Sequence, residues 1–233
     1  MFRTTVITVA LLLASLSVFA QNRVSADVEV KTLRNGKVTT VTKREFCKSD
    51  GRLVSVFSSP TKYVMTTNLD GEMVMYSPAT KEAFRDRGDE YSSIEDLLFL
   101  FLTGRSADLG LTSLGYALSG SSTDEDGYLK RVYTTRKKEA VPRVEVVLKD
   151  FLPVYVAYMD HSGNVVSKTY LSGYDLASRF VFPSRVTAID YLKDRDSSVT
   201  RTLYSNIKLN SDESGFSFVL PDDAISVANP LKR

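Results

Sequence analysis

The chain has 233 residues, of which 43% are hydrophobic and 25% charged, a composition typical of globular proteins and not of disordered or low-complexity chains. Thirty Lys and Arg residues against 28 Asp and Glu residues leave a net charge of +2, so the chain has no global field that would attract nucleic acid. The single cysteine, Cys47, and the single histidine, His161, exclude an internal disulfide, a CxxC redox centre and a Cys/His zinc site.

The first twenty residues have the pattern of a secretory signal peptide. Arg3 supplies a positive start, Val6–Phe19 is an almost unbroken apolar run, and Ala20 completes a small-residue cleavage site. We therefore predict cleavage before Gln21 and export to the periplasm, with an uncleaved N-terminal anchor as the alternative. Residues 21–233 contain no proline-rich or serine-rich linker and no repeat, so we expect them to form a single domain.

Most of the remaining chain predicts antiparallel strands, because Thr, Val, Tyr and Phe are frequent and turn signals recur every 8–12 residues. Asn35-Gly36 and Asp70-Gly71 are hairpin signals, since these residues tolerate positive φ. The expected strands are Val28–Leu33, Val38–Phe46, Leu53–Phe57, Lys62–Leu69, Glu72–Tyr76, Tyr128–Thr135, Arg143–Lys149, Val154–Met159, Val165–Leu171, Phe180–Tyr191, Val199–Leu209 and Phe216–Leu220.

Helices interrupt the sheet after its first half. Ser92 and Glu95 form a capping-box pattern, and Gly104 occupies the place of a C-terminal glycine, which predicts a helix over Ser92–Thr103. Its apolar residues surround the axis, so we expect it to be buried on more than one side, with Phe101 in the core and Phe99 facing a ligand. A second, weaker helix is expected to carry Leu111, Leu114 and Leu118 and to end at Gly120.

Two strand regions carry more apolar surface than one core face needs. Phe151–Met159 shows no polar alternation. Met65, Met73 and Met75 gather in one hairpin, where a two-residue Asp70-Gly71 turn would pair Met65 with Tyr76. This pairing would put Met65, Val74 and Tyr76 on one face and Met73 and Met75 on the other. Ordinary core packing and an apolar binding surface both explain the pattern.

Reactive constellations are missing from the sequence. GxSxG, HExxH, GxGxxG and GxxxxGK[ST] motifs do not occur, and His161 lies in an expected hairpin turn. The acidic stretch Asp124–Asp126 lacks the regular ligand spacing of an EF-hand. We therefore expect no catalytic residue, no metal site and no cofactor, so that the protein is not an enzyme.

The order of features resembles the periplasmic lipoprotein-carrier family of the LolA type. The resemblance covers roughly Asp50–Val227 and depends on four segments, none of them diagnostic alone. These are the strand leading into a proline (Gly51–Pro60), the Asp-Gly, strand and Tyr-x-Pro series (Asn68–Pro78), the helix Ser92–Thr103 and the closing F-x-F-x-x-P stretch (Phe216–Ala224). Val64 stands where the family commonly has an arginine.

The resemblance implies a mainly β fold, an incomplete, half-open antiparallel barrel with a helical lid over an apolar concave face. It implies a monomeric carrier that binds acyl chains of lipoproteins, or lipid, and moves them towards the outer membrane. Candidate partners are then an inner-membrane release complex and an outer-membrane acceptor, but no nucleic acid. The candidate cavity and lid residues are Tyr63, Met65, Met73, Val74, Met75, Tyr76, Leu97, Leu98, Phe99, Phe101, Leu102, Val154, Val156 and Tyr158.

Two alternative functions stay open, a fixed binder and an enzyme without a recognisable motif. An exported sheet protein could use the same apolar face for a fixed contact with a protein or with the cell envelope. A carrier and a fixed binder differ in one observable, because a carrier purified from cells should bring lipid with it.

Overall fold

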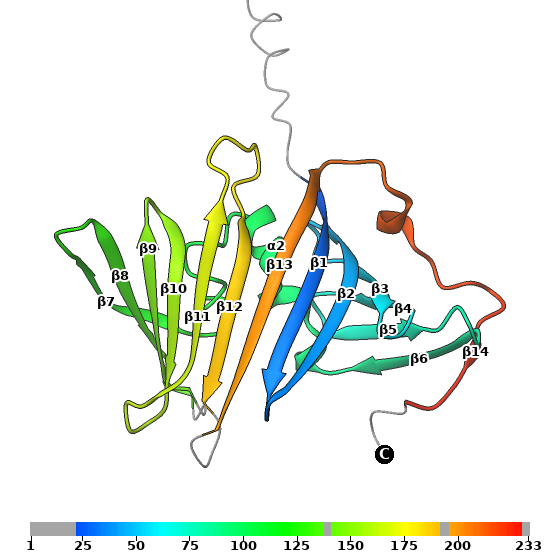
Figure 1. Cartoon of the computed structure of the whole chain (residues 1–233), viewed down its shortest axis with the longest axis horizontal. Helices are drawn as coiled ribbons and strands as arrows, with labels where there is room; N and C mark the ends of the chain where they lie inside the picture. The colour runs from blue at the N-terminus through cyan, green and yellow to red at the C-terminus, as the bar shows by residue number, and fades with distance from the viewer. Residues whose placement is uncertain (1–21, 138–140, 192–195, 230–233) are drawn as a thin grey trace, which may run out of the picture.

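The computed structural model describes residues 22–137, 141–191 and 196–229, so the predicted signal peptide, with its cleavage site before Gln21, lies outside the described residues. The described strands form one open sheet in the order β14-β6-β5-β4-β3-β2-β1-β13-β12-β11-β10-β9-β8-β7 (Figure 1). Neighbouring strands are antiparallel except for the pair β14 and β6. The bounds are β1 Arg23–Arg34, β2 Lys37–Lys48, β3 Leu53–Ser59, β4 Tyr63–Thr67, β5 Glu72–Tyr76, β6 Glu82–Arg87, β7 Ala117–Thr123, β8 Tyr128–Thr134, β9 Arg143–Lys149, β10 Leu152–Met159, β11 Val165–Tyr174, β12 Pro183–Tyr191, β13 Ser197–Leu209 and β14 Ile225–Ser226. The mainly β, half-open sheet is the predicted fold class.

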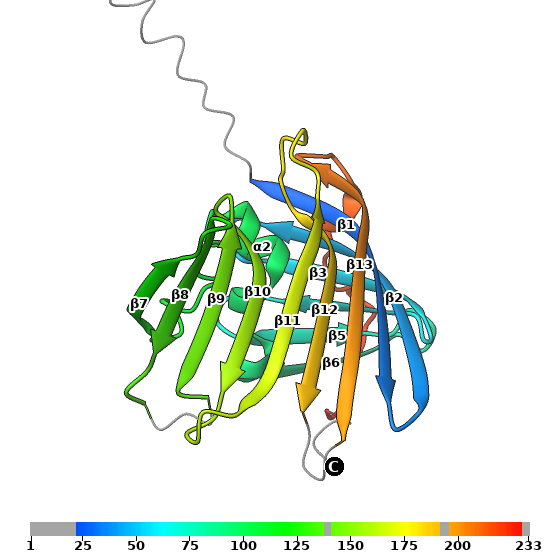
Figure 2. The same ribbon diagram turned by 60° about the vertical axis from the view of Figure 1, so that its left-hand side comes forward.

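Chain order explains why one face of the sheet is covered. Strands β1 to β6 run outward from the centre to one side, and β7 to β13 begin at the other edge and return to pair with β1. The connection from β6 to β7, residues 88–116, must therefore cross the width of the sheet. It lies inside the curve of the strands (Figure 2), and we call it the lid segment.

The lid segment contains one short α-helix, α2 (Leu97–Leu102), after two turns of 3-10 helix at Asp89–Tyr91 and Ser93–Glu95. The helix starts later than predicted, because Asp96 and not Ser92 caps it, accepting a hydrogen bond from the Phe99 amide at 3.2 Å. Its end matches the prediction. Gly104 has a φ of +71°, and the Arg105 amide donates to the Leu100 carbonyl, which is a Schellman motif.

The second predicted helix is wrong. Residues 105–116 form successive turns, and Leu118 and Gly120 belong to strand β7. Three glycines with positive φ explain the difference, because Gly104, Gly110 and Gly115 repeatedly turn the chain out of helical geometry. None of the helices in the described residues is long and apolar enough to span a membrane.

Another expected element, the strand Phe216–Leu220, is also wrong. Residues Ser214–Ser217 form a 3-10 helix, and the chain then crosses the outer, convex face of the sheet. Phe216 packs edge-on against Phe46 with 5.2 Å between ring centroids. The segment closes a core of its own with Val54 and Val64, so its apolar pattern reflects burial against a sheet face and not strand pairing.

The methionine hairpin has a register different from the predicted one. Met65 pairs with Met75, not with Tyr76, and Thr67 pairs with Met73. The turn is longer than two residues, because the Asn68 side chain accepts hydrogen bonds from the amides of Asp70 and Glu72 at 3.1 and 3.0 Å. A shift of one residue exchanges the faces, so the three methionines share one face.

Candidate functional site

A cavity of about 470 Å³ lies between the lid segment and the inner, concave face of strands β10 and β11. This volume falls within the ~300–1,000 Å³ range of small-molecule sites. Apart from Glu95, Thr169 and two tyrosines, its walls are aliphatic. The lining residues are Glu95, Leu97, Leu100, Leu109, Leu111, Leu114, Tyr116, Val141, Val156, Tyr158, Thr169 and Leu171.

The lid side of the cavity comes from α2 and the turns that follow it. Gly110 packs so closely on α2 that a Cβ atom there would lie 2.9 Å from Leu100 Cδ2. The hydroxyl of Tyr116 donates to the carbonyl of Val141 at 2.7 Å, which ties the end of the lid segment to the start of β9. The turns therefore pack on α2 at one point and are hydrogen-bonded to the sheet side at the other.

The sheet side of the cavity is a ladder of inward-facing residues. Val156 is paired with Val146 on β9 and with Thr169 on β11, and both valines are buried. Tyr158 lies two residues further along β10. Burial raises the pKa of Tyr158 to about 12, with smaller contributions from Glu95 and Tyr116. The neutral hydroxyl is thereby favoured, and it is a polar group in a largely apolar wall.

The predicted lid residues divide into two groups. Leu97 lines the cavity, whereas Leu98, Phe99 and Leu102 are buried in the main core against β1 and β2. The prediction that Phe99 faces a ligand is wrong, because Phe99 lies in the main core, and Phe101, predicted in the core, packs at its edge. Phe99 is 1% exposed, whereas Phe101 is half-buried, with its ring 5.0 Å from that of Phe182.

The predicted β10 residues are mostly brought to the cavity. Val156 and Tyr158 line it. Val154 does not, because it lies at a register shift between Pro153 and Tyr155, where β10 has an extra residue relative to β9. This bulge shifts the alternation of faces, which sequence alternation alone does not reveal.

The hairpin residues lie away from the cavity. Met65, Met73, Met75 and Tyr63 share the inner face, where Tyr63 stacks on Phe57 at 4.0 Å. Val74 and Tyr76 face the opposite way, with Tyr76 beneath Phe218 of the C-terminal segment at 6.4 Å between centroids. These residues build the other half of the sheet and do not join Val156 and Tyr158.

Sequence reasoning missed the part of the cavity that turns contribute. Leu109, Tyr116 and Val141 show no helical or strand periodicity, and Leu109 itself has a φ of +49°. Leu111 and Leu114 were expected on one helix face and do line the cavity together, although from turns. The sequence feature that could have identified them is the run of leucines interrupted by glycines, which indicates an apolar segment without regular secondary structure.

A second, smaller pocket of about 260 Å³ lies beside α2 on the inner face of β2 to β4, and its lining is polar. Lys43 forms an ion pair with Glu45, which is 1% exposed and also accepts a hydrogen bond from Ser55 at 3.2 Å. Asp96 lines the same pocket. Burial raises the pKa of Asp96 to about 7, Glu45 adds to the shift, and Lys43 opposes it.

Asp96 makes the stability of the lid depend on pH. Because its pKa is raised from an ordinary 3.8 to about 7, the folded state holds the proton more tightly, and stability falls as pH rises from about 4 to about 7. Asp96→Asn keeps the capping oxygen but cannot ionise. We expect the difference in free energy of unfolding between the variant and the wild type to grow in favour of the variant from about pH 4 to about pH 7 and to stay constant above about pH 7. Urea unfolding at a series of pH values measures this difference.

Asp108→Asn is the matched control, since Asp108 also caps lid turns, accepting from the amides of Gly110 and Thr112 at 3.1 and 3.2 Å. A constant difference between Asp96→Asn and the wild type from pH 4 to 8 would contradict the assignment of the titration to Asp96.

The residues that the structure describes contain no group of three or more His, Cys, Asp or Glu side chains that could hold a metal ion. Cys47 is buried, and burial raises the pKa of its thiol, which disfavours the reactive thiolate. The described residues include an apolar cavity under the lid segment and a polar pocket beside α2.

No protein-family model matches the sequence, and no curated protein matches it either. Solved structures do match. A LolA superfamily protein from Nitrosomonas europaea is 16% identical, with a TM-score of 0.57 over 83% of this chain and 89% of the other. A DUF1329 family protein from Desulfovibrio piger is 17% identical, with a TM-score of 0.60 over 90% and 94% of the two chains.

A third match is a putative outer membrane lipoprotein-sorting protein domain from Vibrio parahaemolyticus. It is 14% identical, with a TM-score of 0.58, and the alignment covers 86% of this chain and 92% of the other. At these identities the likeness concerns the fold. The open, curved sheet with the lid segment inside its curve is accordingly a LolA-like fold.

Proposed function

We propose that this protein binds acyl chains of lipids or lipoproteins in the cavity between the lid segment and strands β10 and β11, and that it carries them as a periplasmic, non-enzymatic carrier. The observation that carries the proposal is the cavity itself, about 470 Å³ of mainly aliphatic lining with a single carboxylate, Glu95. The apolar run at residues 6–19 supports export, and the resemblance to a lipoprotein-sorting domain supports the choice of ligand.

The energetics of such a ligand suit the site. Each buried CH₂ contributes roughly 0.8 kcal/mol, so a long acyl chain could contribute on the order of 10 kcal/mol before the costs of ordering it and of opening the lid. Tyr116 and Tyr158 provide hydroxyl groups at the wall, which can orient the polar end of a chain.

We place the moving part of the lid segment at residues 105–116 and not at α2. Four of the six residues of α2 are buried, Leu98, Phe99, Leu100 and Leu102. The following turns contain positive-φ glycines and are held to the sheet chiefly by Leu111 and by the bond from Tyr116 to Val141. We therefore propose that this turn region moves to admit the ligand while α2 stays in place.

A larger side chain that fills the cavity should exclude the ligand. We expect Leu114→Trp to place a large ring in the cavity and to weaken binding of a fluorescent fatty acid by about tenfold or more, since even part of a chain excluded from burial costs that much. Leu118→Trp is the matched control, because Leu118 is 55% exposed on β7 and lies outside the cavity lining. Circular dichroism would establish that both variants fold.

Unchanged affinity in a folded Leu114→Trp variant would contradict the proposed cavity. The role as a carrier has a separate test. Protein purified from the cell envelope should yield lipid when an organic extract is analysed by mass spectrometry. An extract without lipid from an otherwise binding-competent protein would favour the fixed contact with an envelope partner over transport.

A further inference from the structure

The outer face of the sheet around the β1–β2 hairpin carries a continuous apolar row. Strand pairing places Val38, Leu33, Val199 and Ile189 side by side across β2, β1, β13 and β12. Val38 and Leu33 are 60% and 44% exposed. The C-terminal segment covers another part of the outer face through Phe216, which packs on Phe46, Val54 and Val64.

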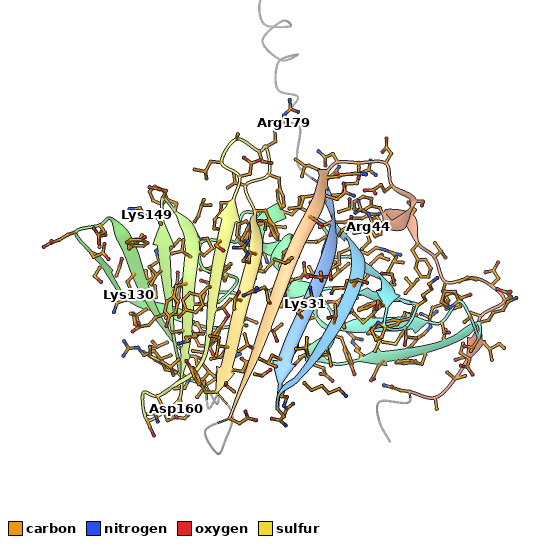
Figure 3. The ribbon with its side chains drawn as sticks, in the orientation of Figure 1. Lys31, Arg44, Lys130, Lys149, Asp160 and Arg179 are labelled. Atoms are coloured by element: carbon orange, nitrogen blue, oxygen red, sulfur yellow. The ribbon has the colours of Figure 1, made fainter. Side chains whose placement is uncertain are left out.

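Cations border this row. Lys31 and Arg201 pair with each other one pleat repeat further along the same strands, and both are exposed (Figure 3 labels Lys31). Arg34 and Lys37, also exposed, flank the turn at the end of the hairpin, where they pair one residue beyond Leu33 and Val38 and so belong to the opposite face. Residues 29–40 contain one acid, Glu29, whose carboxylate lies 2.8 Å from Lys31 Nζ.

This positive surface is local. The chain as a whole carries a net charge of only +2, so the cations of the hairpin are a concentration of charge and not a sample of a basic protein. The apolar row and the cation row are two residues apart along the strands, about 6.6–6.8 Å. At a membrane surface, apolar side chains that enter the headgroup boundary by ~5–10 Å keep neighbouring cations at the level of the phosphates.

We propose that this face, made of Leu33, Val38 and Val199 with Lys31 and Arg201, docks on the surface of a bilayer that contains anionic lipid. The combination distinguishes a bilayer from a soluble polyanion. A polyanion would use the cations alone, whereas a bilayer uses the cations and the exposed apolar pair together. The proposal adds an interaction surface to the lipid-binding function and does not depend on the cavity.

The absence of tryptophan from the sequence gives a direct test. Val38→Trp introduces a single fluorophore into the apolar row, in protein purified from the envelope and shown by N-terminal sequencing to begin at Gln21. With vesicles of phosphatidylglycerol and phosphatidylcholine, its emission should shift to the blue and should be quenched by brominated lipid. Val219→Trp, on the C-terminal segment where Val219 is 78% exposed, should show neither effect.

Charge reversal tests the cations. In the Val38→Trp background, Lys31→Glu with Arg201→Glu should reduce the blue-shifted fraction by about tenfold or more, and added salt should act in the same direction. Lys81→Glu with Arg87→Glu, two exposed sites on and beside β6, is the control and should leave the shift unchanged. Binding of a fluorescent fatty acid should be the same in both double variants, so a failure to dock can be distinguished from a failed cavity.

Two outcomes would overturn the proposal. The first is equal emission of Val38→Trp with anionic vesicles, with phosphatidylcholine vesicles and in buffer. The second is retention on soluble polyphosphate without any shift on vesicles, which would assign the cations to a polyanion. Because Val38 is already largely exposed, its substitution leaves the core intact, and Leu33→Trp provides a second reporter on the neighbouring strand.

Discussion

Lys43→Met should lower the free energy of unfolding by about 3–5 kcal/mol, because it leaves a buried carboxylate without its counter-ion. Glu45 is 1% exposed, and after the substitution the Ser55 hydroxyl would be its one remaining side-chain donor among the described residues. Asp96 lies in the same pocket, and without Lys43, which lowers the pKa of Asp96, its carboxyl group would hold its proton more tightly. Urea unfolding at pH 7.5 measures the loss.

The matched control is Lys31→Met. Lys31 also pairs with a glutamate on its own strand, but both side chains are largely exposed, and such pairs contribute about 0–1 kcal/mol. The double variant Lys43→Met with Glu45→Leu should recover most of the lost stability, since it removes both charges and leaves an apolar pair. A loss below about 1 kcal/mol for Lys43→Met would mean that water reaches Glu45, contrary to its burial.

Phe99→Ala should cost about 3–5 kcal/mol, the usual range for a phenylalanine deleted from a close-packed core. Phe99 is 1% exposed and packs in the cluster that joins α2 to β1 and β2. Phe101→Ala should cost clearly less, since Phe101 is half-buried and contacts mainly Phe182 and Tyr174 at the edge of the helix. The two substitutions are chemically identical and only two residues apart, which makes each the control for the other.

A fatty-acid binding assay distinguishes loss of stability from loss of ligand binding in these two variants. Neither phenylalanine lines the cavity, so each variant that folds should bind a fluorescent fatty acid with nearly wild-type affinity. A greater loss of stability for Phe101→Ala than for Phe99→Ala would show that α2 is rotated on the sheet relative to the structure. Guanidinium unfolding followed by far-ultraviolet circular dichroism gives both values.

Much of the sheet could be predicted from local chemistry. Asn35 and Gly36 adopt φ values of +50° and +70°, as a two-residue hairpin turn requires, and the strands on either side follow from their β-branched residues. The predictions failed where a side chain or a distant segment changed local geometry. Asn68 lengthened the turn before β5, and Phe216 found a partner in Phe46 on the sheet face.

The cavity was predictable only from its sheet side. Val156 and Tyr158 belong to a strand that is apolar on both faces, and this pattern marked them as candidates. Leu97 was identified by helical periodicity, but the same periodicity placed Phe101 inside and Phe99 outside. An apolar sequence of six residues, LLFLFL, fits several rotations, and the capping residue Asp96 together with the path of the lid segment selects one of them.

The pairing of β1 with β13 places the two ends of the sheet-forming chain side by side at its centre. The Asn22 amide donates to the Asn210 side chain at 3.1 Å, and the Asn210 amide donates to the Arg23 carbonyl at 2.9 Å. Each half of the sheet is a meander of sequence neighbours, whereas this central junction needs a loop closed over nearly the whole chain, which is slow to form. Until β13 emerges, β1 and β12 present open edges on which other chains can add strands. Formation of the β1–β13 pair is therefore the folding step before which a newly made chain is most open to strand pairing with other copies.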